Sequence, residues 1–456
     1  MPKKFLILTL SILTFTACKK NDKLFDNSKK NTSNSFQEIF NSTNADAVFD
    51  CVATPDNKLI SCGTSTSYSN DNLTRSTLFK VDDKGKMAWY KVFNFGGAYD
   101  NFFKVKLTPD KKILLIGQST YEDGAQNIVI TKTDLDGNLL FSMEYDMNFE
   151  LNFSELLIDV VQTNDGGFAF TCGKNNKLLL VKLSQQGSVL WSKYFLTDYS
   201  GTSSSLIEDG ENLVIGGSVY NSENFVYRIG FLLKVNKLDG SVIWSKKYDT
   251  GFDEEFMKLQ NTGTEYTVVG RLQATYPTIR RFDTSGNSAS SKQFFPSAPY
   301  GNFNGSISPI NGGIIIEDGF GFPFNDVYLY KLDNSGNIEW SKKYPQNSTL
   351  EYLQNVVEMS DGNYMGAGRY VNSNFDNNDK VYLIKTDRNG NSSCITQSVN
   401  SSIQNLVTNE SDAIWNSENI LIPSANPNTQ IISTVLKSKS LCECSDDEDD
   451  DDNDKN

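Results

Sequence analysis

The segment KVNKLDGSVIWSKKY at residues 234–248 contains the pattern that decides the fold of this chain. A Lys begins a short polar stretch that ends in Gly240, and aromatic residues follow four and eight positions later, as Trp244 and Tyr248. Alternate residues of a strand point to the same side of a sheet, so both aromatics share one face. Variants of the pattern recur at seven glycines, 46 to 54 residues apart: Gly85, Gly137, Gly187, Gly240, Gly286, Gly336 and Gly390. An internal repeat of about 50 residues predicts one four-stranded blade per repeat.

A second pattern lies half a repeat away, where two β-prone runs flank a tight turn. Examples are TPDN at residues 54–57 and TNDGG at residues 163–167. Pro suits the second position of such a turn, and Gly or Asn suits a left-handed position later in it. Each repeat is therefore predicted to contain strand A, this turn, strand B, a variable loop, strand C, a second turn and the aromatic strand D. A Lys recurs in strand C, and we expect it to pair with the polar residue, usually Asp, two positions on.

The last repeat lacks its aromatic strand, because Cys394 and Ser398 replace the two aromatics after Gly390. Phe36 and Phe40, near the N-terminus, have the same four-residue separation. A strand at these residues would complete the last blade and remove the exposed edges of an open sheet. The sequence therefore predicts an all-β, seven-bladed β-propeller of four-stranded blades over residues 35–396, closed by an N-terminal strand.

The phrase at residues 234–244 resembles the tryptophan-docking motif of quinoprotein-like β-propellers, in which the tryptophan packs between neighbouring blades. Most other copies in this chain are one residue shorter between the Lys and the Gly. The chain also has seven repeats, whereas quinoproteins commonly have eight. The resemblance implies the architecture. The pyrroloquinoline quinone and calcium ion of that family find no matching residues, so we expect no cofactor and no metal. The segment DLDGN at residues 134–138 looks like part of a calcium loop, but a β-turn is the simpler interpretation.

Residues 1–17 have the features of a bacterial lipoprotein signal peptide. Two lysines precede an apolar stretch, residues 5–15, that is too short to span a bilayer. The segment FTAC at residues 15–18 resembles the lipobox, which implies cleavage before Cys18 and lipid attachment to its thiol. An ordinary signal peptide with a chance cysteine is the alternative. Residues 18–34 are expected to form a flexible tether. In the lipoprotein family an Asp directly after the lipidated cysteine holds proteins at the inner membrane, and here Lys19 stands at that position. The resemblance therefore implies the outer membrane, on its periplasmic or cell-surface face.

Composition excludes several functions. The chain has no histidine, so Ser/His/Asp and Cys/His nucleophilic systems and histidine zinc sites are ruled out. The net charge is −14, and no basic stripe exists to neutralise the phosphates of a nucleic acid. Residues 445–456 form an acidic tail that we expect to be disordered. Residues 397–444 form a C-terminal extension with strand-like pieces and no recognisable motif. Six further cysteines, at positions 51, 62, 172, 394, 442 and 444, leave the disulfide connectivity open.

The loops between strands B and C and between strands D and A are long, variable and aromatic, so we expect them to form the binding face. Repeat six is the richest, and its candidate ligand-binding residues are Tyr300, Phe303, Phe320, Phe322 and Phe324. Aromatic rings beside Asn and Asp suit the recognition of sugars or peptides. A self-packed cluster of loop side chains is the alternative.

Two functional hypotheses follow. The first is a lipoprotein held at the outer membrane by its lipid, whose propeller is a binding or interaction scaffold for a glycan, a peptide or an envelope protein. At the level of the fold it resembles the lipoprotein scaffold of the β-barrel assembly machinery. The second is a polysaccharide-degrading enzyme that uses paired carboxylates, for which Asp326, Asp376 and Asp379 lie in variable loops. Nothing singles out a catalytic pair, so the first hypothesis is favoured.

Overall fold

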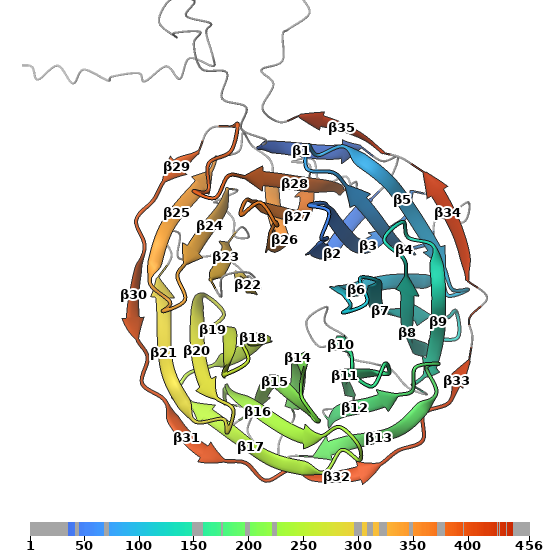
Figure 1. Ribbon diagram of the computed structural model, residues 1–456, viewed down its shortest axis with the longest axis vertical. Coiled ribbons are helices and arrows are strands. Elements are labelled where there is room, and N and C mark those ends of the chain that lie inside the picture. Colours follow the sequence, from blue (N-terminus) through green and yellow to red (C-terminus); the bar gives the residue numbers. More distant parts are fainter. Residues whose placement is uncertain are drawn as a thin grey trace, which may run out of the picture. The chain divides into compact units, whose positions relative to one another are not determined.

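A computed structural model describes residues 35–440 except 42–44, 68–72, 148–157, 175–176, 197–200, 221–225, 296–302, 308–312, 319–325, 346–349, 372–378, 395, 426, 428 and 435. These residues belong to one compact unit, Asn34–Cys442. They form strands and no helix, and the strands are arranged in seven five-stranded sheets around a central axis (Figure 1). The all-β, seven-bladed propeller is confirmed. In the described part of the chain we find no helix of the length and apolarity that crossing a membrane requires.

The blades, numbered 1 to 7 along the chain, repeat one order of strands from the axis outward. The innermost strands are β2 (Asp46–Ala53), β6 (Tyr99–Leu107), β10 (Ile158–Gln162), β14 (Gly201–Asp209), β18 (Glu254–Asn261), β22 (Phe303–Ile307) and β26 (Leu350–Glu358). The second strands are β3 (Leu59–Ser65), β7 (Ile113–Thr120), β11 (Phe168–Lys174), β15 (Asn212–Tyr220), β19 (Glu265–Leu272), β23 (Ile314–Asp318) and β27 (Tyr364–Val371). The third strands are β4 (Arg75–Val81), β8 (Gln126–Thr133), β12 (Lys177–Leu183), β16 (Arg228–Asn236), β20 (Tyr276–Asp283), β24 (Val327–Leu332) and β28 (Lys380–Thr386).

The fourth strands carry the aromatic pairs, except in blade 5, where Ser290 replaces the first aromatic. In blades 1 to 6 they are β5 (Met87–Asn94), β9 (Leu139–Asp146), β13 (Val189–Leu196), β17 (Val242–Asp249), β21 (Ser288–Phe295) and β25 (Ile338–Tyr344). Blade 7 takes its fourth strand from the other end of the chain: β1 (Phe36–Asn41) pairs antiparallel with β28, with Phe40 opposite Val381. The predicted closure by an N-terminal strand is therefore confirmed.

Each blade has a fifth strand, so the prediction of four-stranded blades was wrong in this respect. Residues 397–440 run around the outside of the ring and add one short antiparallel strand to every blade (Figure 1). We call this segment the belt. It visits blades 6, 5, 4, 3, 2, 1 and 7 in that order, through β29 (Gln397–Ser398), β30 (Ser402–Asn405), β31 (Asn409–Asp412), β32 (Asn416–Asn419), β33 (Ser424–Ala425), β34 (Gln430–Thr434) and β35 (Lys437–Ser440).

The belt advances by seven residues per blade. Every seventh residue lies opposite the second aromatic of a fourth strand: Ile403 opposite Phe294, Glu410 opposite Tyr248, Ser417 opposite Phe195, Ser424 opposite Tyr145, Ile431 opposite Phe93, and Ser438 opposite Phe40. An extended chain rises by about 3.3 Å per residue, so seven residues cover about 23 Å from one blade to the next. Short polar strands of this kind also protect the sheet edges beneath them from pairing with other chains.

The belt fills the outer ends of the gaps between blades. Trp415 packs among apolar residues of blades 3 and 4, with its ring 4.8 Å from that of Phe231. Ile422 and Leu436, one and three steps further on, are buried in the same way between blades 2 and 3 and between blades 7 and 1. The residues beside them, such as Ile414 and Leu421, are exposed. At each of these three interfaces, one apolar side chain of the belt is therefore buried between two adjacent blades.

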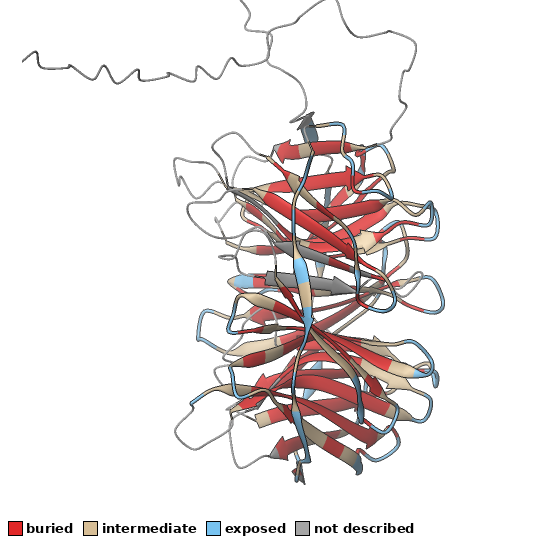
Figure 2. Cartoon of the chain, turned by 90° about the vertical axis from the view of Figure 1, so that its left-hand side faces the viewer, coloured by how far each residue is buried: buried red, intermediate tan, exposed pale blue. Residues whose placement is uncertain are grey.

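The core of the protein lies between the blades. The buried apolar residues of the described part form seven clusters, and each cluster combines side chains of two adjacent blades. Figure 2 shows the strands buried along most of their length and the turns exposed. This distribution is expected when both faces of each sheet pack against a neighbour.

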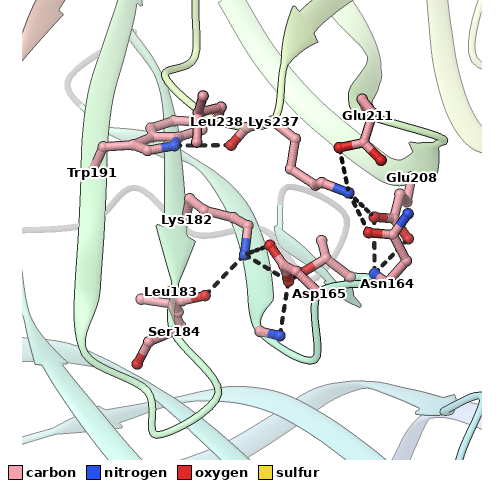
Figure 3. A network of polar contacts seen from close by, with 12 residues as sticks. Asn164, Asp165, Lys182, Leu183, Ser184, Trp191, Glu208, Glu211, Lys237 and Leu238 are labelled. Atoms are coloured by element: carbon pink, nitrogen blue, oxygen red, sulfur yellow. Dashed lines mark hydrogen bonds and ion pairs between the residues drawn. The ribbon is translucent and has the colours of Figure 1, made fainter.

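In every blade except blade 5, where Ser290 stands in its place, the first aromatic of the fourth strand docks on the glycine turn of the next blade. Trp191 donates a hydrogen bond from Nε1 to the carbonyl oxygen of Lys237 at 3.0 Å (Figure 3). Its ring lies against Gly240. A Cβ atom on Gly240 would lie 2.9 Å from the Trp191 ring, and the φ of Gly240 is +67°. The other contacts of this kind are Phe36 on Gly85, Trp89 on Gly137, Phe141 on Gly187, Trp244 on Gly286 and Trp340 on Gly390. The contact of Phe36 shows that β1 also docks blade 7 on blade 1.

The recurring lysines of the third strands are structural, but their partners differ from the prediction. Five of the six reach the aspartate at the turn between the first and second strands, not the one two positions on: Lys80 with Asp56 at 3.3 Å, Lys132 with Asp110 at 2.8 Å, Lys182 with Asp165 at 2.9 Å, Lys234 with Asp209 at 2.7 Å, and Lys385 with Asp361 at 3.9 Å. The sixth, Lys331, pairs with Glu339 of the fourth strand at 3.5 Å. The expected partner instead closes its own turn. Asp134, for example, accepts hydrogen bonds from the backbone N–H groups of Asp136 and Asn138.

The contact of Lys182 with Asp165 predicts how the stability depends on pH (Figure 3). Partial burial acts to raise the pKa of Asp165, but hydrogen bonds from Thr163 and Lys182 lower it from 3.8 to about 2. A carboxylate with a lowered pKa in the folded state stabilises the fold above the pKa of the unfolded chain. We expect Asp165→Asn to lower the free energy of unfolding at pH 7, with the difference shrinking between about pH 4 and pH 2. Urea unfolding at several pH values measures this, with the exposed Asp136→Asn as the control. A difference that does not change with pH would contradict it.

Candidate functional site

A cavity of about 590 Å³ lies among the innermost strands of the blades. Volumes of this size are typical of sites for small ligands. Its lining combines three lysines, Lys104, Lys106 and Lys258, with carboxylates that include Asp50 and Asp159. With Glu358 as the third carboxylate, the lining has three positive and three negative side chains. Apolar residues such as Val52 and Leu107 complete the wall. The cavity is therefore polar at defined positions, which is the usual composition of a site that orients a ligand.

Irregularities in the innermost strands help to place the polar residues. The register of pairing with the second strand shifts by one residue in β2, β6, β14, β18 and β26. Such a bulge turns the following side chain toward a new direction. The residues at this register position, which we call the ring position, are Asp50, Lys104, Asp159, Ser205, Lys258 and Asn355 in blades 1, 2, 3, 4, 5 and 7.

Asp50 joins blade 1 to both of its neighbours. Its Oδ2 accepts a hydrogen bond from the backbone N–H of Val105 in blade 2 at 3.1 Å. Its Oδ1 accepts one from Nδ2 of Asn355 in blade 7 at 2.6 Å. The same Oδ1 accepts the N–H of Cys51, the next residue in the chain, at 3.0 Å. Both carboxylate oxygens are therefore used to hold adjacent blades together.

The same arrangement continues around the cavity. Asp159 in blade 3 accepts the backbone N–H of Leu206 in blade 4 at 2.8 Å and pairs with Lys106 of blade 2 at 2.7 Å. Ser205 in blade 4 accepts the backbone N–H of Leu259 in blade 5 at 3.1 Å. Ring-position side chains thus connect the blades through backbone groups next to the bulges, and the wall of the cavity is fixed by these bonds.

Two lysines at the ring position differ in their surroundings. Lys258 donates to Oδ1 of Asn355 at 2.8 Å. Lys104 is half-buried and lines the cavity, and no hydrogen bond or ion pair joins its side chain to another described residue. The carboxylates at the ring position of the neighbouring blades, Asp50 and Asp159, already have hydrogen-bond partners on both oxygens. Lys104 is therefore the cation of the cavity that is best placed to meet an anionic group of a ligand.

Two acidic residues near the start of innermost strands are buried away from the cavity. Burial raises the pKa of Asp100 to about 6, although hydrogen bonds from the N–H of Phe95 and the hydroxyl of Ser119 act against it. Glu254 forms a buried bidentate pair with Arg280, with distances of 2.9 and 2.6 Å. Arg280 also donates to Oγ1 of Thr408 in the belt at 2.6 Å. These groups tie strands together, and Arg280 connects the core of blade 5 to the belt.

The aromatic residues proposed for the binding face are not placed by the structure. Tyr300, Phe320, Phe322 and Phe324 lie outside the described residues, and Phe303 begins β22 but its side chain is not described. Two of the three candidate carboxylates are described: Asp326 pairs with Lys343 at 2.6 Å, and Asp379 lies 4.0 Å from Arg369. Asp376 lies outside the described residues. Each described carboxylate faces a cation of its own blade.

Sequence reasoning missed the ring position. A signal was present, because a polar residue followed by an apolar one recurs six residues before the turn aspartate, as in Asp50 before Asp56, Lys104 before Asp110 and Asp159 before Asp165. Asn355 and Asp361 repeat the spacing. Since the polar residue differs in charge from blade to blade, a search for one repeated residue type does not find it.

No protein-family model and no curated protein matches this chain. Solved structures with similar folds include the Penicillium chrysogenum α-L-arabinanase complexed with arabinobiose, at 12% identity over 78% of this chain and 98% of that chain, with a TM-score of 0.44. They also include the GH93 α-L-arabinofuranosidase of Fusarium graminearum with arabinobiose, at 12% identity, 78% and 98% coverage and a TM-score of 0.46. Drosophila Semaphorin 1a, extracellular domains 1–2, matches at 8% identity, 77% and 88% coverage and a TM-score of 0.46. Similarities of this size carry no argument about activity.

Proposed function

We propose that this protein is a lipid-anchored binding protein of the bacterial cell envelope that accepts a small carboxylate-bearing ligand in its central cavity. Lys104 is the observation that carries the proposal, because it lines the cavity without a described partner for its ammonium group. An ammonium group that lines a cavity without a protein counter-charge is available for a charge-assisted hydrogen bond to an anionic ligand. A carboxylate of an acidic sugar or of a peptide would supply this anionic group.

The bonding of the cavity wall favours binding over catalysis. A general acid or base must be free to exchange a proton with a substrate. Asp50 and Asp159 instead accept backbone N–H groups of adjacent blades, and proton transfer to them would weaken contacts that hold the ring. A wall fixed in this way is preorganised, so little conformational entropy is lost when a ligand binds.

Titration of the soluble protein, starting after Lys20, with acidic ligands tests the proposal. The probes are uronic-acid oligosaccharides and acidic peptides, each compared with a neutral analogue, and calorimetry gives the dissociation constant. We expect an acidic probe to bind, the neutral analogue to bind at least about tenfold more weakly, and Lys104→Ala to lose about the same factor, because one charge-assisted hydrogen bond contributes roughly 1.5–3 kcal/mol.

The matched control is Lys84→Ala, which removes an exposed lysine of a turn in the neighbouring blade. Circular dichroism melts of both variants report whether the fold is intact. Equal affinities of the wild type and Lys104→Ala for every probe would refute the cavity as the anion site. A difference between the sugar and peptide probes identifies the source of the carboxylate.

The anchoring part of the proposal rests on the lipobox sequence. We expect Cys18→Ser to release the protein from the membrane fraction into the soluble envelope fraction, because several acyl chains on one cysteine provide a stable anchor and nothing else in residues 19–34 replaces it. Fractionation followed by immunoblotting measures the distribution. Continued sedimentation of the processed variant with membranes would refute the lipoprotein assignment. Localisation at the outer membrane, on either face, is part of the same proposal.

The aromatic loops of blade 6 remain the proposed contact for a larger partner, such as a glycan, a peptide or an envelope protein. Tyr300, Phe303, Phe320, Phe322 and Phe324 are the residues concerned. Their aromatic and amide-rich composition supports this part of the proposal.

A further inference from the structure

We infer that the ligand of the central cavity is an amphiphile, a carboxylate joined to a hydrocarbon body, and not a sugar acid. The inference rests on the proposed function, since it takes Lys104 as the contact of the carboxylate, and it deepens that function by naming the rest of the ligand. The wall between the ring position and the mouth of the cavity supports it, because the described side chains of this wall are mostly apolar.

The cavity opens at the face that carries the short turns between the first and second strands. Its described lining runs from the ring position to Pro55 and Ser360, which are exposed residues of these turns in blades 1 and 7. An extended chain covers about 16 Å over the five residues from Asp50 to Pro55. No described residue of the lining belongs to a loop between the second and third strands or between two blades. A ligand therefore enters past the short turns and meets the ring position at the inner end.

Two residues beyond the ring position, the innermost strands place a second side chain on the same side, because alternate residues of a strand share a face. In blades 1 and 7 these side chains are Val52 and Val357, and both line the cavity. Leu107 of blade 2, three residues beyond the ring position, lines it as well. We call these three residues the apolar tier. The position of Val52 and Val357 is also apolar and half-buried in blades 3 and 4, as Val161 and Ile207.

The polar side chains of the same wall are bonded elsewhere or buried. Lys106 returns to the ring position, where its ammonium group pairs with Asp159 at 2.7 Å, so its methylene stem is the part that remains for the wall. The hydroxyls of Thr54 and Ser360 donate to other residues of the short turns, at 2.6 and 3.0 Å. The side chain of Glu358 is only 3% exposed. Little hydrogen-bonding capacity is therefore left for the body of a ligand.

Such a wall suits a hydrocarbon better than a sugar. Each sugar hydroxyl that leaves water needs a new hydrogen-bond partner, and a buried hydroxyl without one weakens binding by roughly tenfold to a hundredfold. Gln260 provides the one amide of the described lining between the ring position and the mouth. A hydrocarbon needs no such partner, and each methylene that leaves water strengthens binding by about fourfold. A carboxylate at Lys104 with its hydrocarbon body against the apolar tier satisfies both parts of the cavity.

Binding of a homologous series of carboxylates to the soluble protein tests the inference. The probes are acetate, butyrate, hexanoate and octanoate, with glucuronate as the sugar acid and 1-octanol as the uncharged analogue, and calorimetry gives the dissociation constants. We expect the affinity to rise by about fourfold per methylene until the apolar tier is covered. Octanoate should bind at least about tenfold more tightly than glucuronate or 1-octanol, because only octanoate combines the charge-assisted hydrogen bond with an apolar body.

Val52→Thr separates the contact of the hydrocarbon from that of the carboxylate. It keeps the volume of the side chain and places a hydroxyl in the apolar tier, so octanoate should bind several-fold more weakly while acetate binds as before. Val226→Thr, at a position that is 67% exposed and does not line the cavity, is the matched control and should change neither affinity. Thermal melts report whether each variant is folded, and Val357→Thr gives the same comparison if Val52→Thr is not.

Lys104→Ala distinguishes failure of this inference from failure of the proposed function. Equal affinities along the series, all reduced in Lys104→Ala, would overturn the hydrocarbon body and leave the carboxylate site intact, and so would a glucuronate that binds as tightly as octanoate. Affinities that rise with chain length but do not change in Lys104→Ala, with 1-octanol binding as tightly as octanoate, would overturn the proposed function and this inference with it. The same follows if no carboxylate binds.

Discussion

Truncation of the chain after Thr396, which removes the belt, is expected to lower the melting temperature sharply and to cause self-association. Trp415, Ile422 and Leu436 are only 7%, 4% and 6% exposed. Burying a large apolar side chain contributes about 1.5–3 kcal/mol, so the loss is roughly 5–9 kcal/mol, against a total stability of about 5–15 kcal/mol for a typical domain. The fourth strand of every blade would also become an open edge that can pair with another molecule.

Light scattering coupled to size exclusion and thermal melts measure these two effects. Deletion of residues 445–456 is the control, because it removes the acidic tail and keeps the belt. Substitutions at two adjacent residues distinguish the packing of belt side chains from the pairing of belt strands. Trp415→Ala should lower the free energy of unfolding by roughly 3–5 kcal/mol. Ile414→Ala, at a position that is 84% exposed, should change it by less than about 0.5 kcal/mol. A monomeric truncated protein with an unchanged melting temperature would show that the belt is dispensable.

The blades could be predicted because most repeats contain several sequence features that recur together. A Lys, a glycine turn and two aromatics recur together every 50 residues or so, and the structure uses the first aromatic to dock on the next blade and the glycine to admit it, as in Trp191 and Gly240. The missing aromatics after Gly390 pointed to a strand from elsewhere. Phe36 and Phe40 supplied it because their spacing matched.

The belt could not be predicted by the same reasoning, because its strands are two to five residues long and mostly polar. A strand is usually found by alternating apolar residues over four or more positions, whereas the buried apolar residues of the belt, Trp415, Ile422 and Leu436, lie seven or fourteen residues apart. A second, half-buried series shows the same seven-residue spacing: Val399, Leu406, Ala413 and Ile420. Its meaning depends on the distance between blades, which is known only once the ring is built.

The partners of the recurring lysines show the same limit. Lys80 and Asp82 are neighbours in the sequence, whereas Lys80 and Asp56 are brought together by pairing of the sheet. A local sequence pattern identifies the lysines that repeat, but it does not predict which turn supplies the aspartate that each lysine contacts. The polar wall of the cavity is of this kind too, since Asp50, Val105 and Asn355 belong to three blades. The site predicted in the loops of blade 6 rests on composition alone, because no local pattern there fixes which side chains meet.

Deletion of residues 35–41, which form β1 and its entry, is expected to destabilise the whole ring. β1 pairs with β28 on one side and with the belt strand β35 on the other, so its removal breaks both the blade and the end of the belt. Phe40 is fully buried in the cluster between blades 7 and 1, and Phe40→Ala alone should cost roughly 3–5 kcal/mol. Leu140→Ala, in the equivalent strand of blade 2 but 53% exposed, is the control and should change stability little. Urea unfolding followed by tryptophan fluorescence measures the three variants. If the deletion left the unfolding midpoint of the wild type unchanged, the ring would be closed by other contacts, and the role assigned to the N-terminal strand would be wrong.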